Sequence, residues 1–186
     1  MSMSPYKQLA ERLDALPNGF PPTEKGAELR LLEKLFTPQE ADLTAQLRLT
    51  PETPQELSER LGRDRREVMG LLRDMTRKGL LNVVREDGRL AYGILAFVVG
   101  IYENQAGTID EELARLFEEY YHQAFGGTLT AQPSVHRVIP IGETVKMDTE
   151  IRPYESAADI VSGAKAWGVT ECICRKQKAL IGDPCD

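Results

Sequence analysis

The sequence predicts a mainly α-helical fold with a small β hairpin: a winged helix-turn-helix followed by helices and a short α+β segment. Two observations predict it. Apolar residues recur at helical spacing along residues 27–77, and capping residues divide that stretch into separate helices. The pattern then alternates on both sides of Asp87-Gly88, a dipeptide typical of tight hairpin turns. Helix, helix, short turn, helix and hairpin is the winged-helix order of elements.

An N-terminal helix and linker, residues 1–26, are expected to precede the winged-helix domain at 27–95. Residues 5–16 have leucines at helical spacing, and the proline- and glycine-rich stretch PNGFPPTEKG ends that helix. AELRLLEKLF, at 27–36, has the apolar spacing of the first helix of the domain.

Two identical tetrapeptides, TPQE at 37–40 and TPQE at 53–56, predict the next two helix starts. Thr can cap the helix, Pro suits its first position, and Glu can bond back to the capping residue. The helices that they open are predicted at 38–48 and 54–61. Because the flanking sequences differ, we interpret the motifs as convergent capping, not as a repeat.

A further helix, the fourth of the domain, is predicted between a tight turn and a glycine. Gly62 and Arg63 form the turn, Asp64 caps the helix with Glu67 as its reciprocal partner, and Gly79 ends it. The hairpin follows directly, so this helix occupies the recognition-helix position of a winged helix.

The segment from Arg60 to Arg89 is basic within an acidic protein. It holds nine Lys and Arg against five Asp and Glu, a difference of +4, in a chain of net charge −6. A recognition helix and wing use such charges for phosphate and guanine contacts. The candidate DNA-binding residues are Arg65, Arg66, Arg73, Arg77 and Arg89.

The same charges also fit a solvated surface that binds no DNA. The expected ion pairs are Glu67 with Arg63 or Arg66, and Asp74 with Arg77 or Lys78. Winged helices also dock proteins, so the fold by itself leaves the function open.

Residues 96–127 are predicted to be a helical segment that ends at Gly126-Gly127. Its second half carries apolar and aromatic residues at helical spacing, which predicts a core face or, alternatively, a homodimer face. Residues 128–186 are predicted to be an α+β segment. It contains the β-like stretches HRVIPI and TVKMDTEI, a helix at about 155–167, and all three cysteines of the chain.

Cys172, Cys174 and Cys185 are the candidate metal ligands. Cys-x-Cys spacing disfavours a mutual disulfide because the ring is strained, but both thiolates can bind one metal centre. Thiolates suit iron–sulfur clusters or zinc. Arg175 and Lys176 are expected to offset the negative charge of the thiolates. A four-iron cluster takes four cysteines, and neither His122 nor His136 has the spacing to replace the fourth.

About residues 20–186 resemble the N-terminal part of bacterial and archaeal ferredoxin-type proteins that carry four-iron four-sulfur clusters behind a winged-helix domain. The stretches that carry the resemblance are LPNGFPPTEKGAELRLLEKLFTPQEADL, the helices through TRKGLL, AYGILAFVVGIYE and CICRKQKALIGDPCD. The resemblance implies that the three cysteines belong to the first ligand set of such a protein. It also implies a fourth cysteine and ferredoxin motifs after Asp186, so the chain is expected to be a truncated form.

Two function hypotheses follow. The first is an iron–sulfur electron-transfer protein with a redox partner protein, and the second is a redox- or metal-responsive winged-helix transcription regulator that binds DNA. No Gly-rich phosphate loop, Ser–His constellation or His-Glu zinc motif supports a hydrolase or transferase, although a subunit of an oxidoreductase stays open. The sequence shows neither a membrane-spanning apolar run nor a signal peptide, which predicts a cytoplasmic protein without membrane contact.

Overall fold

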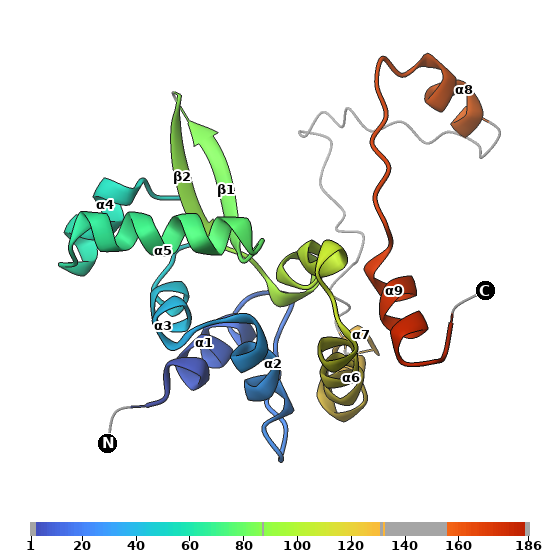
Figure 1. Cartoon of the computed structure of the whole chain (residues 1–186), viewed down its shortest axis with the longest axis horizontal. Coiled ribbons are helices and arrows are strands. Elements are labelled where there is room, and N and C mark those ends of the chain that lie inside the picture. Colours follow the sequence, from blue (N-terminus) through green and yellow to red (C-terminus); the bar gives the residue numbers. More distant parts are fainter. Residues whose placement is uncertain (1–2, 87, 131, 133–155, 185–186) are drawn as a thin grey trace. The chain divides into compact units, whose positions relative to one another are not determined.

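The computed structural model describes residues 3–86, 88–130, 132 and 156–184. The chain divides into two compact units, one made of Met1–Val135 together with Glu171–Asp186, the other of His136–Thr170. Most described residues of the first unit are helical, and a single two-stranded antiparallel sheet is present among them. The predicted mainly α fold with a small β hairpin is therefore confirmed (Figure 1).

The elements follow in the predicted order. The first five helices and the hairpin are α1 (Pro5–Asp14), α2 (Ala27–Leu35), α3 (Pro38–Ala45), α4 (Pro54–Leu61), α5 (Arg65–Arg77), β1 (Leu81–Glu86) and β2 (Arg89–Ile94). After them come η1 (Phe97–Ile101), η2 (Glu103–Gly107), α6 (Glu111–Tyr120), η3 (Tyr121–Phe125), α7 (Gly126–Thr130), α8 (Ser156–Gly163) and α9 (Ile173–Leu180). The two β-like stretches predicted after residue 128 lie outside the described residues. No described helix is both long and apolar enough to cross a membrane.

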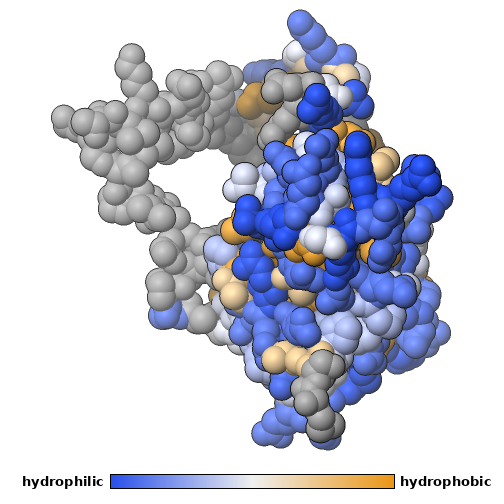
Figure 2. Space-filling model, turned by 90° about the vertical axis from the view of Figure 1, so that its left-hand side faces the viewer, coloured by the Kyte–Doolittle hydropathy of each residue, from blue (hydrophilic) through white to orange (hydrophobic). Residues whose placement is uncertain are grey.

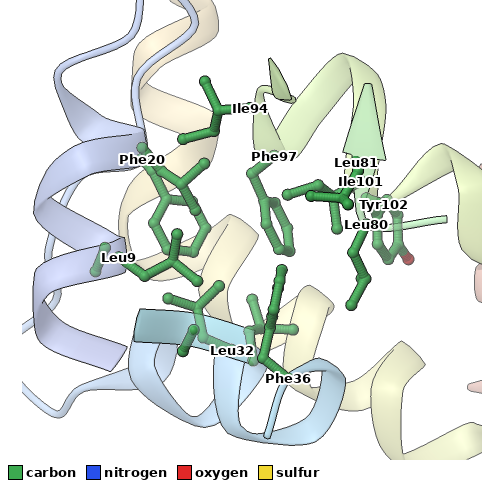
Figure 3. Packing of buried hydrophobic residues seen from close by; sticks show 14 of the residues in the cluster. Leu9, Phe20, Leu32, Phe36, Leu80, Leu81, Ile94, Phe97, Ile101 and Tyr102 are labelled. Atoms are coloured by element: carbon green, nitrogen blue, oxygen red, sulfur yellow. The ribbon is translucent and has the colours of Figure 1, made fainter. Parts of the chain in front are cut away.

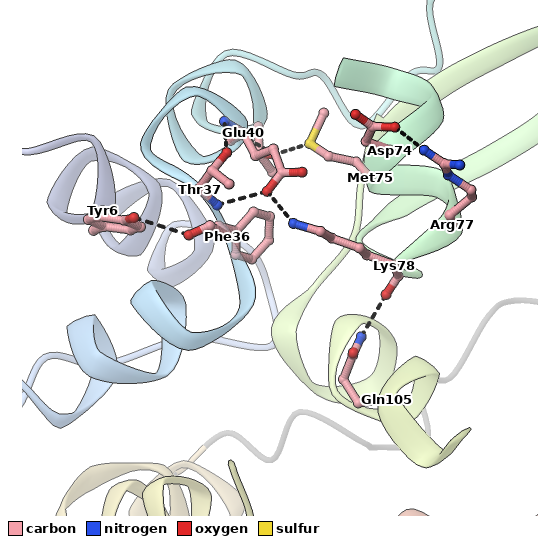
Figure 4. A network of polar contacts seen from close by, with 10 residues as sticks. Tyr6, Phe36, Thr37, Glu40, Asp74, Met75, Arg77, Lys78 and Gln105 are labelled. Carbon is pink, nitrogen blue, oxygen red and sulfur yellow. Dashed lines mark hydrogen bonds and ion pairs between the residues drawn. The ribbon is translucent and has the colours of Figure 1, made fainter. Parts of the chain in front are cut away.

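Both TPQE motifs start helices as predicted. The Thr37 hydroxyl accepts a hydrogen bond from the Glu40 amide at 3.3 Å, and the Glu40 carboxylate accepts one from the Thr37 amide at 2.7 Å. The second motif forms the same reciprocal pair. The first motif does more than cap, because Glu40 is only 3% exposed and binds Lys78 Nζ at 2.8 Å. This contact joins the start of α3 to the end of α5 (Figure 4).

The turn between α4 and α5 also forms as predicted. Gly62 ends α4 with a positive φ of 63°, a conformation that costs glycine little. The Asp64 carboxylate then caps α5 by accepting hydrogen bonds from the amides of Arg66 and Glu67 at 2.9 and 3.0 Å. The hairpin pairs Leu81 with Ile94 at its base.

A third stretch of backbone joins the hairpin. Glu52, just ahead of α4, pairs with Tyr92 of β2, and their two backbone hydrogen bonds measure 2.9 and 2.8 Å. The hairpin, which follows α5 in the chain, is therefore also bonded to the residues just before α4.

One hydrophobic core runs through the first unit. It takes Leu9 from α1, Leu32 from α2 and Leu72 from α5, all at most 1% exposed. Beside these leucines the Phe20 and Phe97 rings lie 4.6 Å apart between their centroids (Figure 3). The aromatic stripe of α6 packs into the same core, since Leu113, Phe117 and Tyr120 are buried. The core interpretation of that stripe is thus confirmed for these residues.

The helical segment predicted after residue 96 differs from the structure in two places. Val98, Val99 and Gly100 have non-helical dihedral angles, so the chain turns sharply where a continuous helix was predicted. The helix does not end at Gly126-Gly127 either, because α7 begins at Gly126 and continues to Thr130. The apolar run FVVGI does not distinguish a helix from such a turn, in which Val99 is 65% exposed.

Candidate functional site

Two of the three candidate ligands lie at the start of α9, which packs against α6 and η2. Ile173 and Gln177 are the buried residues of α9, at 5% and 3% exposure. The Gln177 side-chain amide donates to Glu118 Oε2 at 2.6 Å, and Lys178 Nζ donates to Glu118 Oε1 at 2.7 Å. Glu118 of α6 therefore holds two successive residues of α9. The hydrogen bond from Lys178 is the main reason why the pKa of Glu118 lies below its ordinary value.

The structure places Cys172 and Cys174 together at the start of α9. Cys172 is the capping residue of α9, and Cys174 lies in its first turn. Both are exposed. The amides of Arg175 and Cys174 are the main cause that lowers the pKa of Cys172, and a hydrogen bond with the Cys174 side chain and the charge of Arg175 add to it. Desolvation and then the charge of Cys172 raise the pKa of Cys174.

These opposite directions make the sulfur of Cys172, at the positive end of α9, the easier of the two to deprotonate. A soft metal centre would take both sulfurs as thiolates, with loss of their protons. The predicted role of Arg175 beside the sulfurs stays a prediction.

The other sequence candidates are placed differently. Cys185 and His136 lie outside the described residues. Lys176 Nζ binds the Glu171 carboxylate at 2.5 Å and the Ala106 carbonyl at 2.6 Å, so it anchors α9 to η2. His122 Nε2 lies 3.0 Å from Glu118 Oε1. Among the described residues, no three His, Cys, Asp or Glu side chains gather closely enough to hold a metal ion.

A buried tyrosine near the cysteines was not predicted as a site residue. Tyr102 is 1% exposed, and its ring stacks on Phe117 with centroids 3.8 Å apart. Its hydroxyl is buried and finds no hydrogen-bond partner among the described residues. Burial is the main cause that raises the pKa of Tyr102, and Cys174 is the next. In the sequence Tyr102 stands in FVVGIYENQ, where nothing distinguishes it from a core aromatic.

The basic segment forms fewer local ion pairs than the sequence predicted. Asp74 does pair with Arg77. Arg63, however, binds Asp42 of α3 rather than Glu67, and Lys78 binds Glu40 rather than Asp74. Arg60, not predicted to pair, binds Glu52 through two hydrogen bonds of 2.6 Å. Arg60, Arg63 and Lys78 therefore stabilise the fold, because their ion pairs connect α4 and α5 to α3 and to the chain before α4.

Four of the five candidate DNA-binding residues make no ion pair within the described part of the chain; they are Arg65, Arg66, Arg73 and Arg89. All four are exposed. Arg65 and Arg89 line one groove of about 480 Å³ between the start of α4, α5 and β2, together with Gln55 and the apolar Met69. Figure 2 shows the face of the molecule on which α4 lies in Figure 1, and hydrophilic residues predominate there.

Comparisons of the chain with protein-family models, with curated proteins and with solved structures found no match.

Proposed function

We propose that the chain binds an iron–sulfur cluster through Cys172, Cys174 and Cys185 and acts in electron transfer. The observation that carries the proposal is the position of Cys172 and Cys174, which are both exposed at the first turn of α9, the positive end of that helix. A bound cluster supplies one-electron chemistry. The resemblance to ferredoxin-type proteins with four-iron four-sulfur clusters supports the same assignment, with a redox partner protein and a cytoplasmic location, where thiols stay reduced.

The residues around the sulfurs have defined tasks in this proposal. The amides of the first turn of α9 and the charge of Arg175 offset the negative charge of the thiolates. Gln177 and Lys178 fix α9 to Glu118, which keeps Cys172 and Cys174 on a rigid support. The exposure of both cysteines leaves room for a third thiolate and for an approaching redox partner.

The direct test is iron and sulfide content after anaerobic reconstitution. We expect the full chain to bind about four irons and as many sulfides, with a non-cysteine or intersubunit group as the fourth ligand. Cys172→Ser and Cys174→Ser should each lose most of both, because a serine oxygen is a poor ligand for this centre. Thr170→Ala, which leaves all thiols in place, should behave like the unchanged protein. A chain that takes up neither iron nor acid-labile sulfide would contradict the proposal.

A second candidate function is that of a redox- or metal-responsive DNA-binding regulator. The specific observation in its favour is the groove between α4, α5 and β2. Arg65 and Arg89 reach it from two different elements, and neither forms an ion pair within the described residues. Such a pair can contact phosphates on two sides of a groove, while the α5 surface faces the bases.

Salt-dependent binding to duplex DNA tests this second function. The double variant Arg65→Gln/Arg89→Gln should bind more weakly, with the slope of log Kobs against log salt reduced by about 2, roughly one per lost phosphate contact. The matched control is Arg48→Gln/Arg115→Gln, which removes the same charge at two other exposed sites. Equal slopes for the two double variants would rule out a role of the groove in DNA binding.

A further inference from the structure

The free hydroxyl of Tyr102 is an exception within this core. A buried polar group without a partner costs about 1–3 kcal/mol, so native structures pair nearly all of them. Tyr102 Oη is the one buried side-chain polar atom left without a partner in the described part of the chain. A phenylalanine here would keep the stacking on Phe117 and avoid that cost. The hydroxyl therefore calls for a role that the contacts of the described residues do not supply.

Tyr120 shows that this core can pair a tyrosine hydroxyl. It is 0% exposed and lies in the same aromatic cluster as Tyr102. Its hydroxyl donates to the Pro21 carbonyl at 3.2 Å. Both tyrosines are thus buried, but only the hydroxyl of Tyr120 has a hydrogen-bond partner among the described residues.

The hydroxyl of Tyr102 lies on the side of the core that α9 covers. Figure 3 shows its ring at the edge of the cluster, with the oxygen directed away from Phe97 and Ile101. Tyr102 immediately precedes η2, and both η2 and α6 are packed against α9. After burial, the neighbours that raise the pKa of Tyr102 are Cys174, Glu103 and Glu118.

Two of these three groups already have other partners. Glu118 accepts hydrogen bonds from Gln177 and Lys178, and Glu103 accepts one from the Gly100 amide at 2.5 Å. Cys174 is the remaining group, and as a thiol it is a weak acceptor. Once its sulfur is a metal-bound thiolate, the same atom becomes a strong acceptor for a phenol.

We propose that Tyr102 is a positioning residue whose hydroxyl donates a hydrogen bond to the Cys174 sulfur when that sulfur binds a metal centre. The inference rests on the proposed function. Hydrogen bonds to ligand sulfurs hold the ligand in orientation and make a bound cluster easier to reduce. Tyr102 thus links the aromatic core to the candidate metal centre.

The test compares Tyr102→Phe with Tyr120→Phe in the full chain. Cd²⁺ is the first probe, because its binding to thiolates is followed directly by ultraviolet absorption. We expect Tyr102→Phe to bind Cd²⁺ about 10- to 100-fold more weakly, which is typical for the loss of a group that orients a ligand. Without metal, its urea midpoint should equal or exceed that of the unchanged protein, because an unused hydroxyl is removed.

Tyr120→Phe should show the reverse. It loses a hydrogen bond that exists without metal, so its urea midpoint should fall while its Cd²⁺ affinity stays unchanged. In chains reconstituted with iron and sulfide, only Tyr102→Phe should shift the reduction potential, and the shift should be to a more negative value.

Two results would overturn the inference, and they can be told apart. If the unchanged chain binds Cd²⁺ through its thiols and Tyr102→Phe matches it in affinity and potential, the role of Tyr102 is wrong and the metal site stands. If the unchanged chain binds neither Cd²⁺ nor iron, the proposed function is wrong and the role of Tyr102 falls with it.

Discussion

Replacing Phe97 by alanine is expected to destabilise the protein by about 3–5 kcal/mol, the range for a fully buried aromatic residue. Phe97 is 1% exposed and stands at the centre of the aromatic cluster. Its ring lies 4.6 Å from Phe20 and 6.5 Å from both Phe117 and Tyr120, measured between centroids. The cavity would therefore open between the ring of Phe20 and two rings of α6, which cannot all move inward to fill it.

Urea denaturation measures this loss as a lower midpoint. Leu49→Ala is a suitable control, since Leu49 is 58% exposed and its truncation should change the free energy of unfolding by less than about 0.5 kcal/mol. Similar midpoints for the two variants would mean that the cluster repacks around the missing ring, and that it is not the rigid support on which Tyr102 and α6 depend.

Removing the Glu118 side chain should release α9. Glu118→Ala leaves the buried Gln177 amide without its acceptor and Lys178 without its main partner. Leaving such an amide buried without an acceptor, or exposing it to solvent, costs the docking of α9 about 2 kcal/mol of free energy. A helix of eight residues has little stability of its own. We therefore expect amide hydrogen exchange in α9 to accelerate by about 30-fold while the exchange of α5 stays unchanged.

Glu112→Ala is the matched control, because Glu112 is on the same helix but pairs with Lys34 of α2. It should leave exchange in α9 as it is. Accelerated exchange in both variants would show that α6 itself has loosened, and that Glu118 has no specific role in docking.

Docking of α9 should also depend on pH. The bonds to Lys178, Gln177 and His122 lower the pKa of Glu118 from its ordinary 4.5. Because the folded pKa lies below the unfolded one, the contribution of Glu118 is complete above pH 4.5 and is lost as the pH falls through the lower value. Exchange in α9, corrected for its intrinsic rate, should therefore rise only in acid.

The helix starts could be predicted from the sequence because their causes are local. In each TPQE motif, the atoms that cap the helix lie within four residues, so the motif contains the whole interaction. The turn at Gly62 and the hairpin are local in the same sense. The sharp turn at Val98–Gly100 includes a contact that is not local, because the Asn18 side-chain amide donates to the Val98 carbonyl at 2.8 Å.

The candidate site could be predicted only in part for the same reason. Cys-x-Cys spacing is local and indicates a shared metal ligand pair. The support under it is not local, because Gln177 and Lys178 bind Glu118, 59 and 60 positions earlier. Charge proximity in the sequence predicted the Asp74–Arg77 pair correctly but not the partner of Arg63, which is Asp42 of α3. The unused hydroxyl of Tyr102 exists only once the core has formed.

The place of α9 in the chain has a consequence for the order of synthesis. Every element that receives α9, including α6 and η2, precedes Cys172 in the sequence. Protein domains fold from their N-terminal side as they leave the ribosome. The receiving surface, with Glu118 and Tyr102 in place, can therefore be complete before the first cysteine is translated. A metal centre built on α9 would be assembled on a platform that has already folded, and the reactive thiols would spend little time without their support.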